Sequence, residues 1–123
     1  MVVIDTNVAI EYLKGNADIA AIVDSYAEKG GVAITAINRY ELLQRVNNTQ
    51  PVLSLISEVN IYDFDERASD RAAEMWHTLK ARGKVVDDLD LLIASIAASN
   101  GETLVTMDKS FRHIDGDIVI ISK

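Results

Sequence analysis

The chain has 123 residues, of which 49% are hydrophobic and 25% are charged, ordinary values for a single globular domain. The absence of cysteine excludes disulfides, thiol catalysis and thiolate metal sites, and no apolar run is long enough to span a membrane. The net charge of -7 argues against nucleic-acid binding by overall attraction alone, so the positions of the acids matter more than their number.

The N-terminus leads directly into a predicted strand at about residues 2–5, without the basic region and cleavage site of a signal peptide. We therefore expect a cytoplasmic protein, with which the absence of cysteine is compatible. Four more segments are short, apolar and rich in Val or Ile, and they predict strands at about 32–35, 60–63, 103–106 and 118–121. Apolar runs without clean alternation are typical of parallel strands that are covered on both faces.

Helical patterns lie between these strands, and they cover residues 7–15, 17–31, 36–48, 51–58, 66–83 and 90–101. Gly15 closes the first pattern, and Asp65 is the expected N-cap of the fifth. No repeat or linker divides the chain, so we expect residues 1–123 to form one domain. The alternation of strands and helices predicts an α/β fold, a three-layer α/β/α sandwich with a mostly parallel five-stranded sheet.

Four acids from distant parts of the sequence are predicted to meet at one edge of this sheet. Asp5 ends the first strand, Glu41 lies two turns into the helix after the second, and Asp108 follows the fourth strand by two residues. Asp90 lies in the first turn of the helix that leads into the fourth strand. Ligands of open α/β sheets bind outside the carboxyl ends of the strands, so this convergence predicts a functional site.

Two of these acids also have a simple structural interpretation. Asp5 could cap the helix that follows it, but Thr6 can cap equally well, which leaves Asp5 for chemistry. Glu41 lies beside a helix face that includes Ile37 and Tyr40 and that we expect to be buried. The helical wheel therefore predicts Glu41 at the border between core and solvent.

The segment "VVDDLDLLIAS" has more acids than helix capping requires. One aspartate suffices as the N-cap and a second could answer the helix dipole, yet Asp87, Asp88 and Asp90 occupy three of four positions. We expect Asp87 or Asp88 to be the cap. This leaves Asp90 for the site, with Asp88 as an auxiliary acid.

Four carboxylates in a small cleft repel one another, and a divalent cation would relieve that repulsion. Oxygen-only ligands favour Mg²⁺ or Mn²⁺ over zinc. Neither His77 nor His113 has a partner at metal-motif spacing, so we interpret both as structural. A bound ion of this kind activates water and stabilises a leaving oxygen, which predicts hydrolysis of a phosphate ester. The sequence has no P-loop motif, which argues against a P-loop nucleotide hydrolase.

Four motifs in this order resemble a PIN domain, and most closely the VapC-type toxin ribonucleases of prokaryotic toxin–antitoxin pairs. They are "IDTN" near the N-terminus, "TAINRYEL" around Glu41, "DLLIASIA" from Asp90 and "LVTMDKSF" around Asp108. The resemblance spans the chain from residue 2 to about 114 and implies an α/β/α sandwich with Mg²⁺- or Mn²⁺-dependent endoribonuclease activity. It also implies an RNA substrate, a homodimer and a cognate VapB-type antitoxin that blocks the active site.

The resemblance also implies roles for individual residues. The matching catalytic acids are Asp5, Glu41, Asp90 and Asp108, and three of them, Asp5, Asp90 and Asp108, are the implied metal ligands. The matching supporting residues are Thr6, Asn7, Asp88 and Thr106. The two threonines match hydroxyl positions beside the first and last acids, and Asn7 completes the opening motif, where we expect it to hold the turn.

Basic residues near the predicted active edge are candidate contacts for RNA phosphates. We expect a rim that consists of Lys14, Arg39, Lys84, Lys109 and Arg112, and we single out Arg39 and Lys109 as substrate-binding residues. Metal ions at the site would offset part of the negative charge, so the acidic composition is compatible with an RNA substrate.

Two other classes of phosphoryl-handling protein share some of these features. A haloacid-dehalogenase-type phosphatase also ends its first strand in an aspartate, but it needs a second aspartate where this chain has Asn7. The alternative function is that of a receiver-like signalling domain, which binds Mg²⁺ and accepts a phosphoryl group. It needs an aspartate at the end of strand three, which Asp63 or Asp65 could supply. Receivers usually pair adjacent acids after strand one, whereas Ile4 precedes Asp5.

Overall fold

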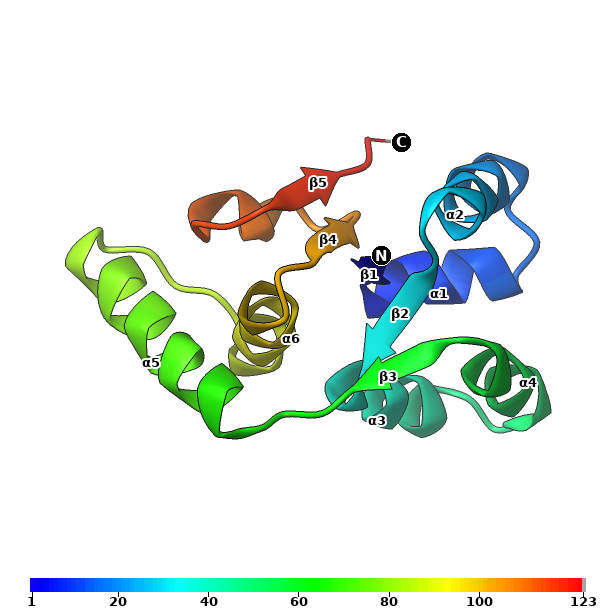
Figure 1. Ribbon diagram of the computed structural model, residues 1–123, viewed down its shortest axis with the longest axis horizontal. Coiled ribbons are helices and arrows are strands. Elements are labelled where there is room, and N and C mark those ends of the chain that lie inside the picture. The colour runs from blue at the N-terminus through cyan, green and yellow to red at the C-terminus, as the bar shows by residue number, and fades with distance from the viewer. Residues whose placement is uncertain (123) are drawn as a thin grey trace.

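The computed structural model describes residues 1–122, which form a five-stranded sheet between two layers of helices (Figure 1). The strands are β1 (Val2–Ile4), β2 (Val32–Thr35), β3 (Asn60–Tyr62), β4 (Thr103–Thr106) and β5 (Ile118–Ile120). Their order is β3-β2-β1-β4-β5, and every neighbouring pair is parallel. The predicted strands and the α/β sandwich are confirmed, and the sheet is parallel throughout.

Helices connect the strands in this part of the chain. They are α1 (Thr6–Leu13), α2 (Ala17–Lys29), α3 (Ala36–Arg45), α4 (Gln50–Glu58), α5 (Glu66–Ala81), α6 (Asp88–Ser99) and the 3-10 helix η1 (Lys109–His113). The sequence predicted all of them except η1, which is too short to show helical periodicity. Gly15 has a φ of 81°, which glycine adopts without strain, and α1 ends just before it as predicted. None of the helices in residues 1–122 is both long and apolar enough to cross a membrane.

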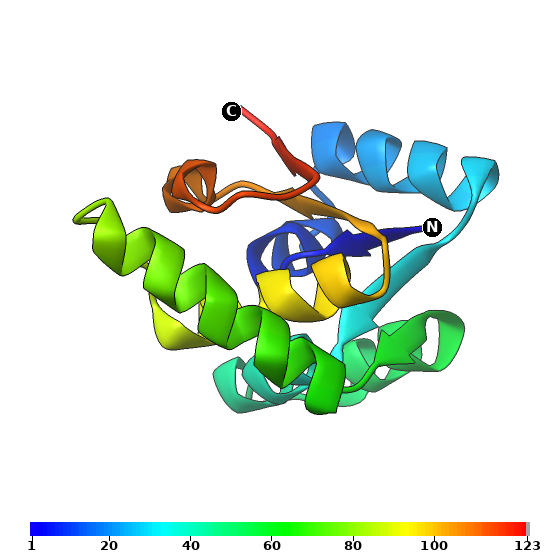
Figure 2. The same ribbon diagram turned by 60° about the vertical axis from the view of Figure 1, so that its left-hand side comes forward.

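Successive residues of the central strands point to opposite faces of the sheet and build two hydrophobic cores. Ile4, Ile34 and Val105 belong to the core that includes residues of α1, α2 and α4. Val3 and Leu104 belong to the core that includes residues of α5 and α6. Figures 1 and 2 show these two helical layers on either side of the sheet. Both faces of the strands are covered, which explains their apolar sequences.

The carboxyl ends of β1, β2 and β4 open on one edge of the sheet. β1 lies between β2 and β4, so the residues that follow these three strands are neighbours in space. α1 begins directly after β1, α3 directly after β2, and η1 three residues after β4. The topology therefore brings the segments that carry Asp5, Glu41 and Asp108 to the same edge.

The strand order separates Asp63 from Asp5. A receiver-type sheet has the order 2-1-3-4-5, in which strands one and three lie side by side. Here β2 lies between β1 and β3, and β3 forms the outer edge of the sheet. An acid just after β3, such as Asp63, therefore lies two strands away from the end of β1. This order argues against the receiver-like alternative.

Candidate active site

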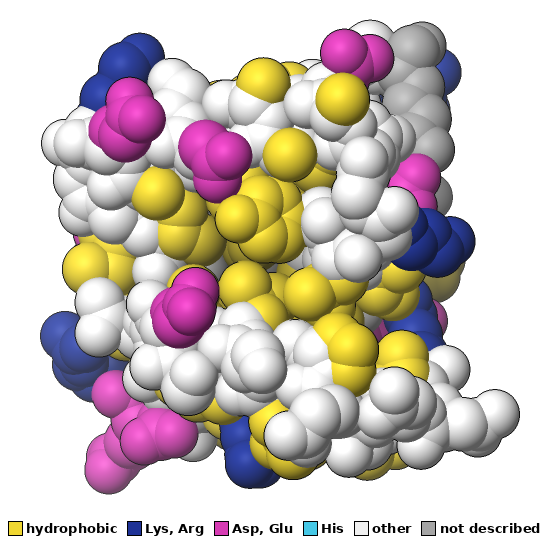
Figure 3. Space-filling view, turned by 90° about the vertical axis from the view of Figure 1, so that its right-hand side faces the viewer, with side chains coloured by type: hydrophobic (Ala, Val, Ile, Leu, Met, Phe, Trp, Pro, Cys, Tyr) yellow, Lys and Arg dark blue, Asp and Glu magenta, His cyan; other side chains and the backbone are white. Residues whose placement is uncertain are grey.

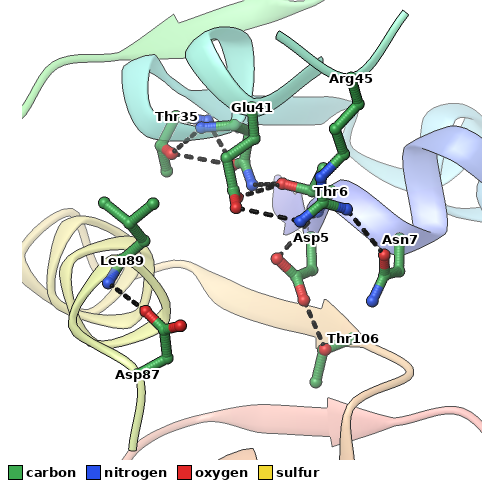
Figure 4. A network of polar contacts seen from close by, with 10 residues as sticks. Asp5, Thr6, Asn7, Thr35, Glu41, Arg45, Asp87, Leu89 and Thr106 are labelled. Carbon is green, nitrogen blue, oxygen red and sulfur yellow. Dashed lines mark hydrogen bonds and ion pairs between the residues drawn. The ribbon is translucent and has the colours of Figure 1, made fainter.

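Asp5 lies at the centre of a buried polar network at the carboxyl ends of β1 and β4 (Figure 4). Its Oδ1 accepts a hydrogen bond from the backbone N–H of Thr6, and its Oδ2 accepts one from the hydroxyl of Thr106, both over 2.8 Å. Only 3% of Asp5 is exposed. Burial raises the pKa of Asp5, and the charges of Glu41 and Asp108 add to this effect, while the two hydrogen bonds lower the pKa.

The hydroxyl of Thr6 connects the start of α1 to α3. It donates a hydrogen bond to Oε1 of Glu41 over 2.7 Å and accepts one from Nδ2 of Asn38 over 2.9 Å. Asn38 in turn forms a reciprocal capping box with Thr35 at the start of α3. The expectation that Thr6 caps α1, and thereby leaves Asp5 for chemistry, was wrong about the cap. Asp5 is the N-cap residue, and its carboxylate serves both the cap and the site.

Glu41 is more deeply buried than its helical wheel predicts. It is 7% exposed, whereas Tyr40, which we expected on the buried face, is 55% exposed. The side of α3 that points inward carries Asn38, Glu41 and Leu42. A carboxylate tolerates this position because Thr6 of α1 and Arg45 of the same helix satisfy its two oxygens.

Arg45 is a site residue that the sequence analysis missed. Its Nη2 lies 3.2 Å from Oε2 of Glu41, and its Nη1 donates a hydrogen bond to Oδ1 of Asn7 over 3.2 Å (Figure 4). The available signal was the spacing, because residues four apart on a helix share one face. Asn7 is exposed and contacts Arg45. The contact joins α1 to α3, which differs from the turn-holding role that we expected.

Asp90 completes the cluster from α6. Asp87, one of the two predicted caps, is the N-cap of α6, and it accepts a hydrogen bond from the backbone N–H of Leu89 over 3.0 Å. Burial, followed by the charges of Asp5 and Asp108, raises the pKa of Asp90 to about 7. Asp90 therefore lies within electrostatic reach of Asp5, Glu41 and Asp108, the other three predicted acids.

Thr106 links the first and last acids of the cluster. Its Oγ1 donates to Asp5 and accepts a hydrogen bond from the backbone N–H of Asp108 over 3.1 Å. Asp108 is also the N-cap of η1, because its Oδ1 accepts a hydrogen bond from the N–H of Ser110 over 2.9 Å. The fourth supporting residue, Asp88, is exposed and lines a separate pocket beside Trp76.

The predicted basic rim is divided among several surfaces. Lys14 and Lys109 line one groove that runs along α1. Arg39 lines a different groove together with Tyr40, on the side of α3 that faces away from Glu41. Lys84 lies in the pocket that includes Trp76. Contacts of Arg39 and Lys109 with RNA stay a prediction.

The donor set of the acid cluster fits a hard divalent cation by its chemistry. Asp5, Glu41, Asp90 and Asp108 offer carboxylate oxygens. Burial raises the pKa of Asp5 and of Asp90, and the charges of neighbouring acids add to this effect, which is the repulsion that a cation would relieve. As the side chains of residues 1–122 stand, no group of three or more acids or histidines is arranged to hold a metal ion. The assignment of Asp5, Asp90 and Asp108 as metal ligands therefore stays a prediction.

Comparison with known proteins gives the family of this chain. The family model of the PIN domain matches residues 2–117. The chain belongs to the PIN domain family. "Ribonuclease VapC3" of Methanocaldococcus jannaschii is 36% identical over 94 residues, which cover 76% of this chain and 95% of that protein. "Ribonuclease VapC1" of the same organism is 30% identical over 111 residues, which cover 88% of this chain and 76% of the relative.

A solved structure shows the same fold. A chain of VapBC2 from Rickettsia felis, bound to a promoter DNA fragment, superposes with a TM-score of 0.83 at 22% sequence identity. The superposition covers 100% of this chain and 99% of the other. The resemblance to VapC-type PIN domains that the four motifs indicated is confirmed.

Proposed function

We propose that this PIN domain is an endoribonuclease and the toxin of a VapBC-type toxin–antitoxin pair. The observation that carries the proposal is that Thr6 and Thr106 connect Asp5 to Glu41 and Asp108 at the carboxyl edge of the sheet, with Asp90 within electrostatic reach of these acids. The relatives named as VapC ribonucleases support RNA as the substrate. An RNA substrate also makes the cytoplasm the proposed compartment.

The proposed cofactor is Mg²⁺ or Mn²⁺, with Asp5, Asp90 and Asp108 as its ligands. When bound, such an ion supplies an activated water and stabilises the leaving oxygen of the phosphodiester. The side chains have separate tasks around it. Thr106 fixes one carboxylate oxygen of Asp5, and Glu41 keeps Thr6 and Arg45 in place through its two oxygens. Asp90, whose pKa the neighbouring carboxylates and burial raise in the absence of a metal, would complete the set of carboxylates that holds the ion.

The proposed protein partner is a cognate VapB-type antitoxin, and we also expect a homodimer. The similar Rickettsia felis structure is a VapBC2 complex. The face on which α2 and α4 lie has a hollow lined by hydrophobic side chains, with acidic side chains around it (Figure 3). Hydrophobic residues of these two helices that solvent reaches include Tyr26, Leu53 and Ile56. Such a surface fits a partner segment with apolar and basic side chains.

The proposal is tested by incubating the purified chain with structured RNAs and Mg²⁺ or Mn²⁺. We expect cleavage by the wild type, no cleavage in the presence of a chelator, and a rate at least about 100-fold lower for Asp90→Asn. Asp18→Asn is the matched control, because Asp18 is an exposed acid in the first turn of α2. Equal behaviour of wild type and Asp90→Asn on every RNA would rule out the proposed function.

A further inference from the structure

A pocket of about 380 Å³ lies between the end of α5, the loop before α6 and the start of α6. We refer to it as the Trp76 pocket. Its lining includes Trp76 and Lys80 of α5, Lys84 and Val85 of the loop, and Asp88 of α6. None of these residues belongs to the acid cluster. The two helices that contribute to the pocket, α5 and α6, pack side by side (Figure 2).

Two large hydrophobic side chains of the Trp76 pocket face solvent. Trp76 is 44% exposed and Val85 is 91% exposed. The ring of Trp76 lies edge to face with that of His77, with 5.1 Å between the centroids, and Nζ of Lys80 lies 4.9 Å from the Trp76 centroid. An exposed indole with a lysine beside it matches the needs of a nucleotide, because bases stack on aromatic rings and phosphates attract cations.

Four basic residues lie in the pocket and on η1, the 3-10 helix that follows Asp108. Lys80 and Lys84 line the pocket, and Lys109 begins η1 directly after the last acid of the cluster. Arg112 donates a hydrogen bond to the backbone oxygen of Lys109 over 3.2 Å. Partial burial, followed by the charges of Arg112 and Lys84, lowers the pKa of His113, so both cations lie near it. We refer to Lys80, Lys84, Lys109 and Arg112 as the basic strip.

The basic strip consists of cations without acidic partners. Within residues 1–122, none of its four members forms an ion pair, whereas four other basic residues do, namely Lys14, Arg45, Arg67 and Arg82. Asp88 lines the same pocket, yet it pairs with no cation among these residues. In a chain of net charge -7, a surface with several unpaired cations is available to phosphates.

We propose that the Trp76 pocket and the basic strip bind a single-stranded stretch of RNA beside the scissile phosphate, with a base stacked on Trp76. The proposal rests on the proposed ribonuclease function. Asp88 of the pocket and Asp90 of the acid cluster both lie in the first turn of α6, so the two sites share one end of this helix. The positive charge of the basic strip favours RNA over a protein partner. The hydrophobic hollow between α2 and α4, which suits a protein partner, lies on another face of the molecule (Figures 1 and 3).

Trp76 is the only tryptophan of the chain, so its fluorescence reports on this pocket alone. The experiment titrates the full chain, in a chelator that prevents cleavage, with a short unstructured RNA and with the same RNA annealed to its complement. We expect saturable quenching by the single strand and little by the duplex. The RNA affinity of the variants is measured by the fluorescence anisotropy of a labelled RNA. Trp76→Ala and Lys84→Ala should each weaken RNA binding roughly tenfold, whereas Trp76→Phe should largely retain the affinity of the wild type. Lys29→Ala is the matched control, because Lys29 is an exposed lysine on α2.

Several results would overturn the proposal. One is cleavage of RNA by the wild type in Mn²⁺ without any quenching of Trp76, which leaves the ribonuclease function intact. Another is quenching of Trp76 in the wild type together with an unchanged RNA affinity of Trp76→Ala and Lys84→Ala, because Trp76 would then only report on RNA that is bound elsewhere. A third is weaker RNA binding by Trp76→Ala together with a changed elution volume of this variant in size-exclusion chromatography, which assigns the pocket to contacts between protein chains. If the wild type neither binds nor cleaves RNA, both proposals fail.

Discussion

The hydroxyl of Thr106 donates a hydrogen bond to Oδ2 of Asp5 over 2.8 Å, although 101 positions separate the two residues in the sequence. The bond joins the end of β4 to the end of β1, and the bond from Thr6 to Glu41 joins α1 to α3 in the same way. The acids are therefore held by the same contacts that close this edge of the fold. Changes to these contacts should affect both stability and chemistry.

Thr106→Val should destabilise the protein by about 1–3 kcal/mol at pH 8, because it leaves a buried oxygen of Asp5 without its donor. The same bond lowers the pKa of Asp5, so its loss should raise that pKa further. Urea unfolding measures the free energy directly. Thr106→Ser keeps the hydroxyl and serves as the control, with stability near that of the wild type. A valine variant as stable as the serine variant would contradict the role assigned to this bond.

Asp90 should make the protein less stable as the pH rises from 3.8 to about 7. Its pKa is raised in the folded state, so in this range the folded protein holds a proton that the unfolded chain has lost. Stability is therefore lost with rising pH until Asp90 is ionised in both states. In a chelator, Asp90→Asn should lose less stability across this range and should be more stable than the wild type at pH 8. Thermal unfolding at several pH values tests this, and parallel pH profiles would contradict it.

Binding of Mn²⁺ should depend on the same ionisation. A proton on Asp90 competes with the metal, so the apparent affinity should weaken by up to about tenfold per pH unit below pH 7. The measurement is the rise in melting temperature on adding Mn²⁺ at pH 6 and at pH 8. Asp5→Asn should show little rise at either pH. A metal-induced rise of equal size at both pH values would mean that Asp90 is not a ligand.

Arg45→Gln should change the affinity for metal and the affinity for RNA in opposite directions. The guanidinium offsets the charge of Glu41, so its removal should strengthen the attraction of the acids for Mn²⁺ and weaken binding of RNA. The side chain of Arg45 is 43% exposed, so stability should change by less than about 1 kcal/mol. Isothermal titration with Mn²⁺ and RNA binding in a chelator give the two affinities. Arg67→Gln, which loses a pair with Asp65 away from the acid cluster, should change neither.

The sequence predicted the position of the acids because strand ends and helix starts share one edge of a parallel sheet. Asp5, Asp90 and Asp108 could be placed from the short apolar strands and from the excess of aspartates before α6. The role of Thr6 could not be predicted, because Thr and Asp are both good N-caps and only the fold shows which one has a partner in α3.

The burial of Glu41 and the Trp76 pocket depend on contacts that no local pattern contains. A helical wheel treats a carboxylate as polar, and only the partners Thr6 and Arg45 reveal that this one is satisfied inside the protein. The Trp76 pocket combines side chains of α5, the following loop and α6, so it becomes visible only when the two helices are packed together.

The most direct test of the account is the rate of RNA cleavage in Mn²⁺ under single-turnover conditions for the wild type, Asp5→Asn and Asp63→Asn. Asp63 is an exposed acid that follows the outermost strand β3, so it serves as the control for Asp5. We predict a rate at least about 100-fold lower for Asp5→Asn and an unchanged rate for Asp63→Asn. Cleavage by Asp5→Asn at the wild-type rate would contradict the assignment of the acid cluster as the active site.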